Sequence, residues 1–305
     1  MHPVIIIGSG PAGLSAALYA ARAELSPILI TGMEFGGQAA ATNVIENYPG
    51  FPEGVGGVQL GELFQKQAER FGASIIYDVV SEVDFSKKPY EITTYNQKYR
   101  AQSVIIATGA RPNHLNVPGE IEFTGKGVSY CATCDGWFFK DKRVVVVGGG
   151  DSALEEGLFL TRYATSVTVI HRRSQLRAGA ILQSRAFANE KMHFIWDTVV
   201  TEIVGKDAVQ AVRLKNLKSG EETLFPTDGV FIFIGHTPNT QIFQGQLEID
   251  ENGYIVVDKR MRTSVPGVFA AGEAADSLYR QVVTSAGMGA AAAMQAVKFL
   301  EEHES

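Results

Sequence analysis

The sequence predicts an α/β fold with two Rossmann-like dinucleotide-binding units. Three observations lead to this prediction. A glycine-rich turn follows a short apolar strand near residue 8, the same arrangement returns near residue 148, and helical and strand-like stretches alternate around both turns. Alternating strands and helices predict parallel sheets, and 305 residues suffice for about two domains.

The composition is that of an ordinary globular protein. Hydrophobic residues make up 45% of the chain and charged residues 20%, and the formal net charge is −6. Because the balance is acidic, binding to nucleic acids or anionic membranes is not expected from charge. No apolar run reaches the ~18–20 residues that span a membrane, and no targeting peptide is expected.

The first unit contains the motif G-x-G-x-x-G in an informative context. The apolar strand 4–7 precedes Gly8-Ser9-Gly10-Pro11-Ala12-Gly13, and a helix over 14–24 and a strand over 27–30 follow. Gly8 allows the turn, Gly10 lets a pyrophosphate approach the backbone, and Gly13 lets the helix pack against the strand. A diphosphate would lie at the helix N-terminus, although a glycine-rich turn without a ligand is the alternative.

Glu34 indicates which nucleotide the first unit would take. It follows Gly13 by about 20 residues, close to the place of the acid that binds the ribose in dinucleotide sites. No basic residue stands beside Glu34. This favours a cofactor with a free 2′-hydroxyl, such as FAD or NAD.

A long loop and several short elements separate the first unit from the cysteines. Residues 36–61 are rich in Gly, Asn and Pro, and such a loop needs a function or a bound ligand to be ordered. A helix over 59–71 and short β segments follow. The strand 104–109 ends in Ala107-Thr108-Gly109, small residues that let the chain pass close to a bound group. Pro112 marks a domain crossing.

The chain has only two cysteines, Cys131 and Cys134, and Asp135 follows them directly. Two thiols three positions apart can close a small disulfide ring, or form a dithiol in which one thiolate is stabilised by its neighbour. Half of a zinc site is one alternative, but no second Cys pair is present and the six histidines are scattered. Two buried thiols that only pack are another. We predict a catalytic redox pair in the cytoplasm, where structural disulfides are rare.

The second unit repeats the first with a different charge pattern. The strand 143–147 leads into Gly148-Gly149-Gly150-Asp151-Ser152-Ala153, a helix to about residue 163 and a strand over 166–170. That strand ends in His171-Arg172-Arg173-Ser174-Gln175-Leu176-Arg177, where an NAD site would carry an acid. Guanidinium groups make charge-assisted contacts with phosphate, so the three arginines favour the 2′-phosphate of NADPH. A solvated basic turn is the alternative.

The C-terminal part returns to strands and ends in a helix. β structure is expected over 194–234, and a strand over 265–273 ends in small residues and Glu273. Tyr279-Arg280-Gln281 then leads into an Ala-rich helix over 284–300. If this helix pointed its N-terminus at a flavin, its dipole would stabilise the reduced anionic ring. Tight helix packing explains the Gly and Ala content equally well.

Together these motifs describe an electron chain. NADPH donates two electrons as hydride, a disulfide accepts two electrons to become a dithiol, and a flavin between them converts one chemistry into the other. The cysteines and the proposed NADPH site belong to the same domain, yet both would have to reach one flavin. We therefore expect the pair to move.

This ordered set of motifs closely resembles the low-molecular-weight thioredoxin reductases of bacteria and plants, over essentially the whole chain. The matching motifs are Gly8-Ser9-Gly10-Pro11-Ala12-Gly13, Thr31-Gly32-Met33-Glu34 with Gly36-Gly37-Gln38, Glu46-Asn47-Tyr48-Pro49-Gly50, Ala107-Thr108-Gly109, Cys131-Ala132-Thr133-Cys134-Asp135-Gly136, the His171–Arg177 run, Tyr279-Arg280-Gln281 and Thr284-Ser285-Ala286-Gly287. The resemblance implies three-layer ββα domains: an FAD domain of residues 1–112 and 242–305, and an inserted NADPH domain of residues 113–241. It also implies a homodimer, thioredoxin as the protein substrate, and rotation of one domain against the other.

The resemblance also assigns roles to single residues. Cys134 would lie beside the flavin, Cys131 would attack the disulfide of thioredoxin, and Asp135 would act as general acid and base. No metal site is implied. The residues that would hold FAD are Gly8, Gly10, Pro11, Ala12, Gly13, Thr31, Gly32, Glu34, Gly36, Gly37, Gln38, Asn47, Ala107, Thr108, Gly109, Gly272, Glu273, Arg280 and Gln281. Those that would hold NADPH are Gly148, Gly150, Asp151, Ser152, Ala153, His171, Arg172, Arg173 and Arg177, with the three arginines on the 2′-phosphate.

Some features depart from the family, and some alternatives stay open. Glu273 stands where relatives usually have Asp, and Ser277 and Val282 stand where close relatives often carry His and Ala. Ferredoxin-dependent relatives are expected to lack the arginine cluster, and flavodoxin or ferredoxin reductases of similar fold lack the Cys pair. A reductase of another thioredoxin-like protein and a non-enzymatic redox sensor are further alternatives. Because no extra redox domain is visible, we expect a separate thioredoxin partner.

Overall fold

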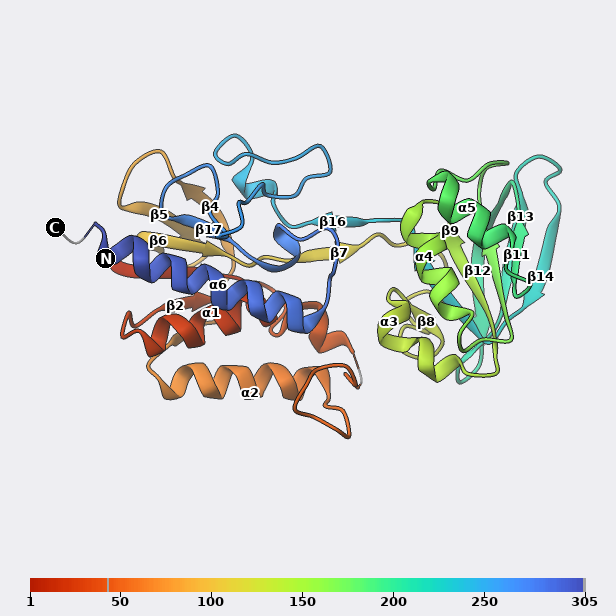
Figure 1. Cartoon of the computed structure of the whole chain (residues 1–305), viewed down its shortest axis with the longest axis horizontal. Coiled ribbons are helices and arrows are strands. Elements are labelled where there is room, and N and C mark those ends of the chain that lie inside the picture. Colours follow the sequence, from red (N-terminus) through yellow and green to blue (C-terminus); the bar gives the residue numbers. More distant parts are fainter. Residues whose placement is uncertain (43, 304–305) are drawn as a thin grey trace. The chain divides into compact units, whose positions relative to one another are not determined.

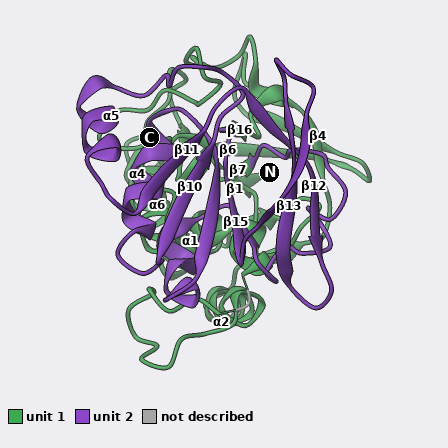
Figure 2. Cartoon of the chain, turned by 90° about the vertical axis from the view of Figure 1, so that its right-hand side faces the viewer, with its two compact units in different colours: residues 1–111, 237–305 green, residues 112–236 purple. Residues whose placement is uncertain are grey.

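The computed structural model describes residues 1–42 and 44–303 and forms two compact units. Unit 1 combines Met1–Arg111 with Thr237–Ser305, and unit 2 is Pro112–His236 (Figure 2). Two short strands, β7 (Ala110–Pro112) and β16 (His236–Pro238), pair with each other where the chain passes from one unit to the other (Figure 1). The domain boundaries expected from the sequence, after residues 112 and 241, stay predictions.

The main sheet of unit 1 is parallel. Its strands follow the order β3-β2-β1-β6, and β17 also pairs with β6. Their bounds are β1 (His2–Ile7), β2 (Ile28–Ile30), β3 (Ser74–Ile76), β6 (Lys98–Ile106) and β17 (Val268–Ala270). The nearly continuous apolar sequence of β1, β2 and the second half of β6 suits a sheet that is covered on both faces.

The alternating side chains of β1 explain why unit 1 has three layers. Ile5 and Ile7 belong to an apolar core shared with an antiparallel meander, whereas Val4 and Ile6 belong to a second core shared with the helices. The meander consists of β4 (Val80–Asp84), β5 (Tyr90–Thr94) and the first half of β6. One long strand thus takes part in both sheet layers.

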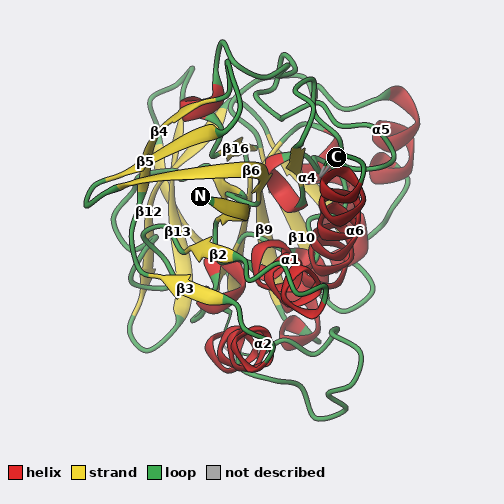
Figure 3. Ribbon diagram, turned by 90° about the vertical axis from the view of Figure 1, so that its left-hand side faces the viewer, coloured by secondary structure: helices red, strands yellow, loops and turns green. Residues whose placement is uncertain are grey.

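Three helices cover the other face of the parallel sheet (Figure 3). They are α1 (Pro11–Arg22), α2 (Gly57–Arg70) and α6 (Val282–Glu301). A Cβ at Gly289 would lie 1.9 Å from the carbonyl oxygen of Ala12, so only glycine lets α6 approach α1 this closely. Short 3₁₀ turns complete the unit: η1 (Gly37–Ala41), η3 (Gln241–Phe243) and η4 (Gly272–Ala274).

Unit 2 repeats this plan. Its parallel sheet has the order β11-β10-β9-β15-β8, and a separate antiparallel sheet has the order β12-β13-β14. Val144 and Val146 of β9 pack toward the helices, and Val145 and Val147 pack toward the antiparallel sheet. The bounds are β8 (Val128–Ser129), α3 (Ala132–Asp135), η2 (Gly136–Phe139), β9 (Arg143–Gly148), α4 (Asp151–Leu160), β10 (Ser166–Ile170), α5 (Ala180–Phe187), β11 (Met192–Ile195), β12 (Thr198–Gly205), β13 (Val209–Asn216), β14 (Glu222–Pro226) and β15 (Gly229–Phe233).

The expected α/β class with two Rossmann-like units is confirmed, with some differences in the elements. The first helix begins at Pro11 rather than at residue 14, because proline fits the first turn of a helix. The sequence pattern does not predict α5, because the helix is short and Ala186 is its one buried residue. Within residues 1–42 and 44–303, no helix has the length and apolar character needed to cross a membrane.

Candidate functional site

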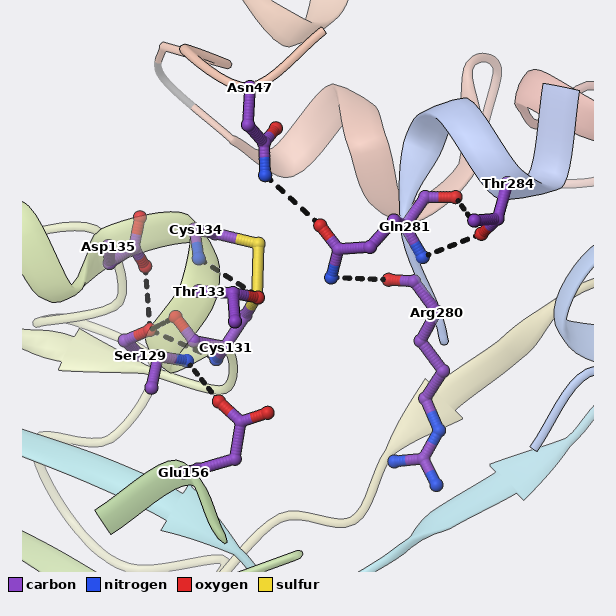
Figure 4. Close-up of a disulfide and its surroundings, with 11 residues drawn as sticks. Asn47, Ser129, Cys131, Thr133, Cys134, Asp135, Glu156, Arg280, Gln281 and Thr284 are labelled. Atoms are coloured by element: carbon purple, nitrogen blue, oxygen red, sulfur yellow. Dashed lines mark hydrogen bonds between the residues drawn. A yellow bond between two sulfur atoms is a disulfide. The ribbon is translucent and has the colours of Figure 1, made fainter. Parts of the chain in front are cut away.

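The two cysteines form a disulfide at the start of α3 (Figure 4). Their Cα atoms are 5.3 Å apart, and Cys131 is the N-cap residue of the helix. Its Sγ accepts a hydrogen bond from the N–H of Cys134 at 3.2 Å, and the hydroxyl of Thr133 lies 3.3 Å away. When the disulfide opens, these donors favour the thiolate at Cys131. In the described part of the chain, no group of three or more His, Cys, Asp or Glu side chains is arranged to hold a metal ion.

Asp135 lies at the end of the same short helix. The hydroxyl of Ser129 donates to its Oδ2 at 2.6 Å. Burial raises the pKa of Asp135 above the ordinary value of a carboxyl, and the hydrogen bond from Ser129 partly opposes this. Asp135 therefore holds its proton to a higher pH than an exposed aspartate, which suits a group that donates a proton to sulfur.

Glu156 of α4 anchors the beginning of α3. Its Oε2 accepts a hydrogen bond from the N–H of Ala132 at 2.9 Å (Figure 4). Neither Glu156 nor Ser129 is among the site residues that the sequence predicts. The signal for Ser129 is a hydroxyl two residues before Cys131, whereas no sequence pattern relates Glu156 to Ala132.

The glycine turn of unit 1 is packed on one side and open on the other. Gly8 has a φ of +109°, and a Cβ there would lie 2.2 Å from the carbonyl oxygen of Ala107. At Gly10 no heavy atom lies within 4 Å of the Cβ position, and no side chain caps α1 there. An open, uncapped helix N-terminus fits the diphosphate of a dinucleotide.

The neighbouring predicted residues gather at the same edge of the sheet. Gly8, Thr31 and Ala107 directly follow β1, β2 and β6, which are adjacent parallel strands. The Ser9 hydroxyl donates to the carbonyl oxygen of Thr31 at 3.0 Å and accepts from the N–H of Gly36 at 3.3 Å. The predicted site residues in the segments that follow these three strands are Gly8, Gly10, Pro11, Ala12, Gly13, Thr31, Gly32, Glu34, Gly36, Gly37, Gln38, Ala107, Thr108 and Gly109.

A second group of predicted residues surrounds the beginning of α6. Gly272 and Glu273 follow β17, and burial raises the pKa of Glu273 to about 7 although the charge of Arg280 opposes this. Gln281 and Thr284 form a capping box on α6, and the side-chain amide of Asn47 donates to Oε1 of Gln281 at 3.1 Å (Figure 4). A partly buried carboxyl and a capped helix thus border the predicted FAD site.

A cavity of about 440 Å³ is lined by the segment after β10, and this segment is bonded to the second glycine turn, because the N–H of Arg177 donates to the carbonyl oxygen of Gly149 at 2.7 Å. Arg172, Arg173 and Arg177 line this cavity together with Asp197, and all three arginines are exposed. No heavy atom lies within 4 Å of the Cβ position of Gly150 at the start of α4. Three cations and an open helix N-terminus fit a phosphorylated nucleotide.

The other residues predicted for this nucleotide have structural partners. The ring of His171 is buried beside Gly149, its Nε2 lies 3.0 Å from the carbonyl oxygen of Gln175, and burial lowers its pKa. Oδ1 of Asp151 accepts from the N–H of Gly179 at 2.7 Å. Ser152 is exposed and Ala153 is buried. Their contacts with a nucleotide stay predictions.

Comparison with known proteins agrees with this geometry. Residues 2–289 match the family model described as pyridine nucleotide-disulphide oxidoreductase. A thioredoxin reductase of Rickettsia felis is 52% identical over 304 residues, covering 98% of each chain. The crystal structure of a thioredoxin reductase from Streptococcus pyogenes matches with a TM-score of 0.94 and 46% identity over 99% of each chain. A thioredoxin reductase from Giardia duodenalis matches with a TM-score of 0.93 and 41% identity, over 98% of this chain and 99% of that one. The chain therefore belongs to the pyridine nucleotide-disulphide oxidoreductase family and, within it, to the thioredoxin reductases.

Proposed function

We propose that the protein passes two electrons from NADPH, through FAD and the Cys131–Cys134 disulfide, to the disulfide of thioredoxin. The observation that carries this proposal is the disulfide itself: it lies in the first turn of α3, with the proton-holding Asp135 four residues beyond the N-cap. The names of the relatives supply the substrate class, and the arginine-lined cavity supports NADPH as the donor.

The residues present fit both cofactors. FAD would be held by the glycine turn of unit 1 and the segments after β2, β6 and β17, and NADPH by the glycine turn and arginines of unit 2. When bound, FAD supplies the two-electron chemistry that links a hydride donor to a disulfide. We propose the division into an FAD domain of residues 1–112 and 242–305 and an NADPH domain of residues 113–241 on this basis.

The reduced cysteines would carry out two exchange steps. The Cys131 thiolate attacks one sulfur of the thioredoxin disulfide, which breaks that S–S bond, forms a mixed disulfide and releases the other sulfur as a thiolate. Asp135 gives this leaving thiolate its proton. The ionised Asp135 then takes the proton of the Cys134 thiol, and the Cys134 thiolate attacks Cys131. This releases the second thioredoxin sulfur as a thiolate, which takes a proton from water, and restores the Cys131–Cys134 disulfide. The enzyme dithiol is oxidised by two electrons, and thioredoxin is reduced by two.

Coupled oxidation of NADPH tests the proposal. The purified protein with NADPH and thioredoxin should oxidise one NADPH for each thioredoxin disulfide that it reduces. NADPH that leaves the flavin oxidised under anaerobic conditions would favour a ferredoxin-dependent enzyme. Turnover only with another thioredoxin-like protein would assign the enzyme to that substrate.

We also propose a homodimer that works in the cytoplasm. The resemblance to thioredoxin reductases supports the dimer, and a lone pair of cysteines that must be reduced in each cycle suits a reducing compartment. Light scattering on the flavin-loaded protein tests the dimer, which should have twice the 32.9 kDa mass of one chain. Fractionation of the host cells tests the location.

A further inference from the structure

We propose that Ser129 is a positioning residue for the proton-handling carboxyl of Asp135, and that it serves this carboxyl in both protonation states. The inference rests on the proposed function, because it concerns the proton that Asp135 delivers during thiol exchange. Ser129 is only 4% exposed and lies at the end of β8, two residues before Cys131. Its hydroxyl contacts both Asp135 and the backbone of Cys131.

The single hydroxyl proton of Ser129 has two acceptors within reach. Oδ2 of Asp135 lies 2.6 Å from Oγ, and the carbonyl oxygen of Cys131 lies 3.2 Å from it. A short bond to an ionised carboxylate is the stronger of the two, so the proton points to Asp135 while that carboxylate is charged. At the same time, Oγ accepts the N–H of Cys131 at 3.1 Å (Figure 4).

The second acceptor matters when Asp135 holds a proton. The carboxyl then becomes a donor to Oγ, and the Ser129 hydroxyl can rotate to the carbonyl oxygen of Cys131. No heavy atom needs to move in this exchange. The carboxyl thus keeps one orientation beside the cysteines while its proton comes and goes, which is the requirement for an efficient general acid.

The other titratable groups on the elements packed against α3 are engaged elsewhere or exposed. On α4, Glu156 accepts the N–H of Ala132, Asp151 accepts the N–H of Gly179, and Glu155 is exposed. After η2, the ammonium of Lys140 lies over the ring of Trp137, 5.4 Å from its centroid. Burial and the Ser129 hydroxyl are the two causes that set the pKa of Asp135, so removal of the hydroxyl should have a defined effect.

Ser129→Ala in the full-length, flavin-loaded enzyme tests the proposal. The variant lacks a hydrogen bond to the charged carboxylate, so the pKa of Asp135 should rise. The limb of the pH profile of kcat/KM for thioredoxin that reflects Asp135 should therefore move by about one pH unit toward alkaline pH. At neutral pH, kcat/KM should fall about tenfold because the carboxyl loses its fixed orientation, although its raised pKa keeps more of it protonated. The KM for NADPH should stay within about twofold. Ser129→Thr, which keeps the hydroxyl, should restore the wild-type profile.

A double-mutant cycle separates this role from general damage. If Ser129 acts through Asp135, the double variant Asp135→Asn/Ser129→Ala should be less active than Asp135→Asn alone by a factor of less than about two. Thr227→Val is the matched control, because Thr227 is a fully buried hydroxyl of unit 2 that bonds to the carbonyl oxygens of Arg143 and Gly229. This control should lower Tm without moving the pH profile.

Two results would overturn the role of Ser129: an unmoved pH profile in Ser129→Ala, or losses in the two single variants that simply multiply in the double variant. If Ser129→Ala does not fold, Ser129→Cys keeps the volume with only a weak donor and carries the same expectations. A wild-type enzyme that fails to reduce thioredoxin with NADPH would contradict the proposed function, whereas an active wild type with an unmoved variant profile contradicts only this inference.

Discussion

The arginine cluster of unit 2 makes a quantitative prediction about the choice of nucleotide. Arg172 and Arg173 are exposed at the rim of the cavity of about 440 Å³, and both would contact the 2′-phosphate of NADPH. A hydrogen bond to a charged group contributes about 1.5–3 kcal/mol, and exposure to solvent and salt places these at the low end. Loss of both contacts should therefore cost about 3 kcal/mol, or about 100-fold in kcat/KM for NADPH.

The assay compares NADPH and NADH in the Arg172→Ala/Arg173→Ala variant. NADH has no 2′-phosphate, so its kcat/KM should change less than about threefold. Arg213→Ala is the matched control, because it removes one exposed guanidinium of the same unit that pairs with Glu202 and lies outside the cavity lining. Equal losses with both nucleotides would refute the assignment of the cluster to the 2′-phosphate.

Three further predictions concern the scaffold. Gly8→Ala should lower the free energy of unfolding by about 3 kcal/mol, because a φ of +109° and a contact of 2.2 Å with Ala107 oppose a side chain. Gly10→Ala, at an open position with a φ of −68°, should keep the Tm of the flavin-free protein but lower the flavin content of the purified protein. Equal stability of the two variants would contradict this prediction. Burial raises the pKa of Glu273 to about 7, so the contribution of this carboxyl to protein stability is complete below its ordinary pKa of 4.5 and is lost as the pH rises through about 7. Glu273→Gln should therefore flatten the fall of Tm between about pH 5 and 8 in the flavin-free protein. An unchanged slope of Tm against pH would disprove this prediction. Glu120, which is 1% exposed, accepts hydrogen bonds from the N–H groups of Leu115 and Asn116 and from the Tyr130 hydroxyl. Glu120→Ala should therefore lower the free energy of unfolding, measured in urea, by about 3 kcal/mol. A loss below about 1 kcal/mol would mean that these hydrogen bonds contribute little to stability.

The elements that the sequence predicts well are those with strong local patterns. The β1 and β9 strands are short runs of Ile and Val, and each leads into a glycine turn and a helix. Helix α6 is rich in small residues, which favour close helix packing, and the structure shows that its partner is α1, with Gly289 at the contact. Patterns of this kind arise because one local arrangement satisfies burial, turn geometry and packing together.

The contacts that complete the site depend instead on the tertiary structure. Ser9 reaches Gly36, Glu156 reaches Ala132, and these partners are far apart in the chain. Single hydroxyl and carboxylate groups have no periodicity, so only the folded structure shows their partners. The nucleotide-binding roles of His171 and Asp151 likewise stay predictions, because the structure gives these side chains protein partners of their own.

The most direct test of the account is thioredoxin reduction by the Cys134→Ser variant beside the wild type. Wild-type protein should oxidise NADPH in proportion to the thioredoxin disulfide reduced. The variant should retain its flavin and still bind NADPH, but its thioredoxin turnover should fall to background because Cys131 has lost its disulfide partner. Full thioredoxin reduction by Cys134→Ser would contradict the claim that electrons pass through this pair.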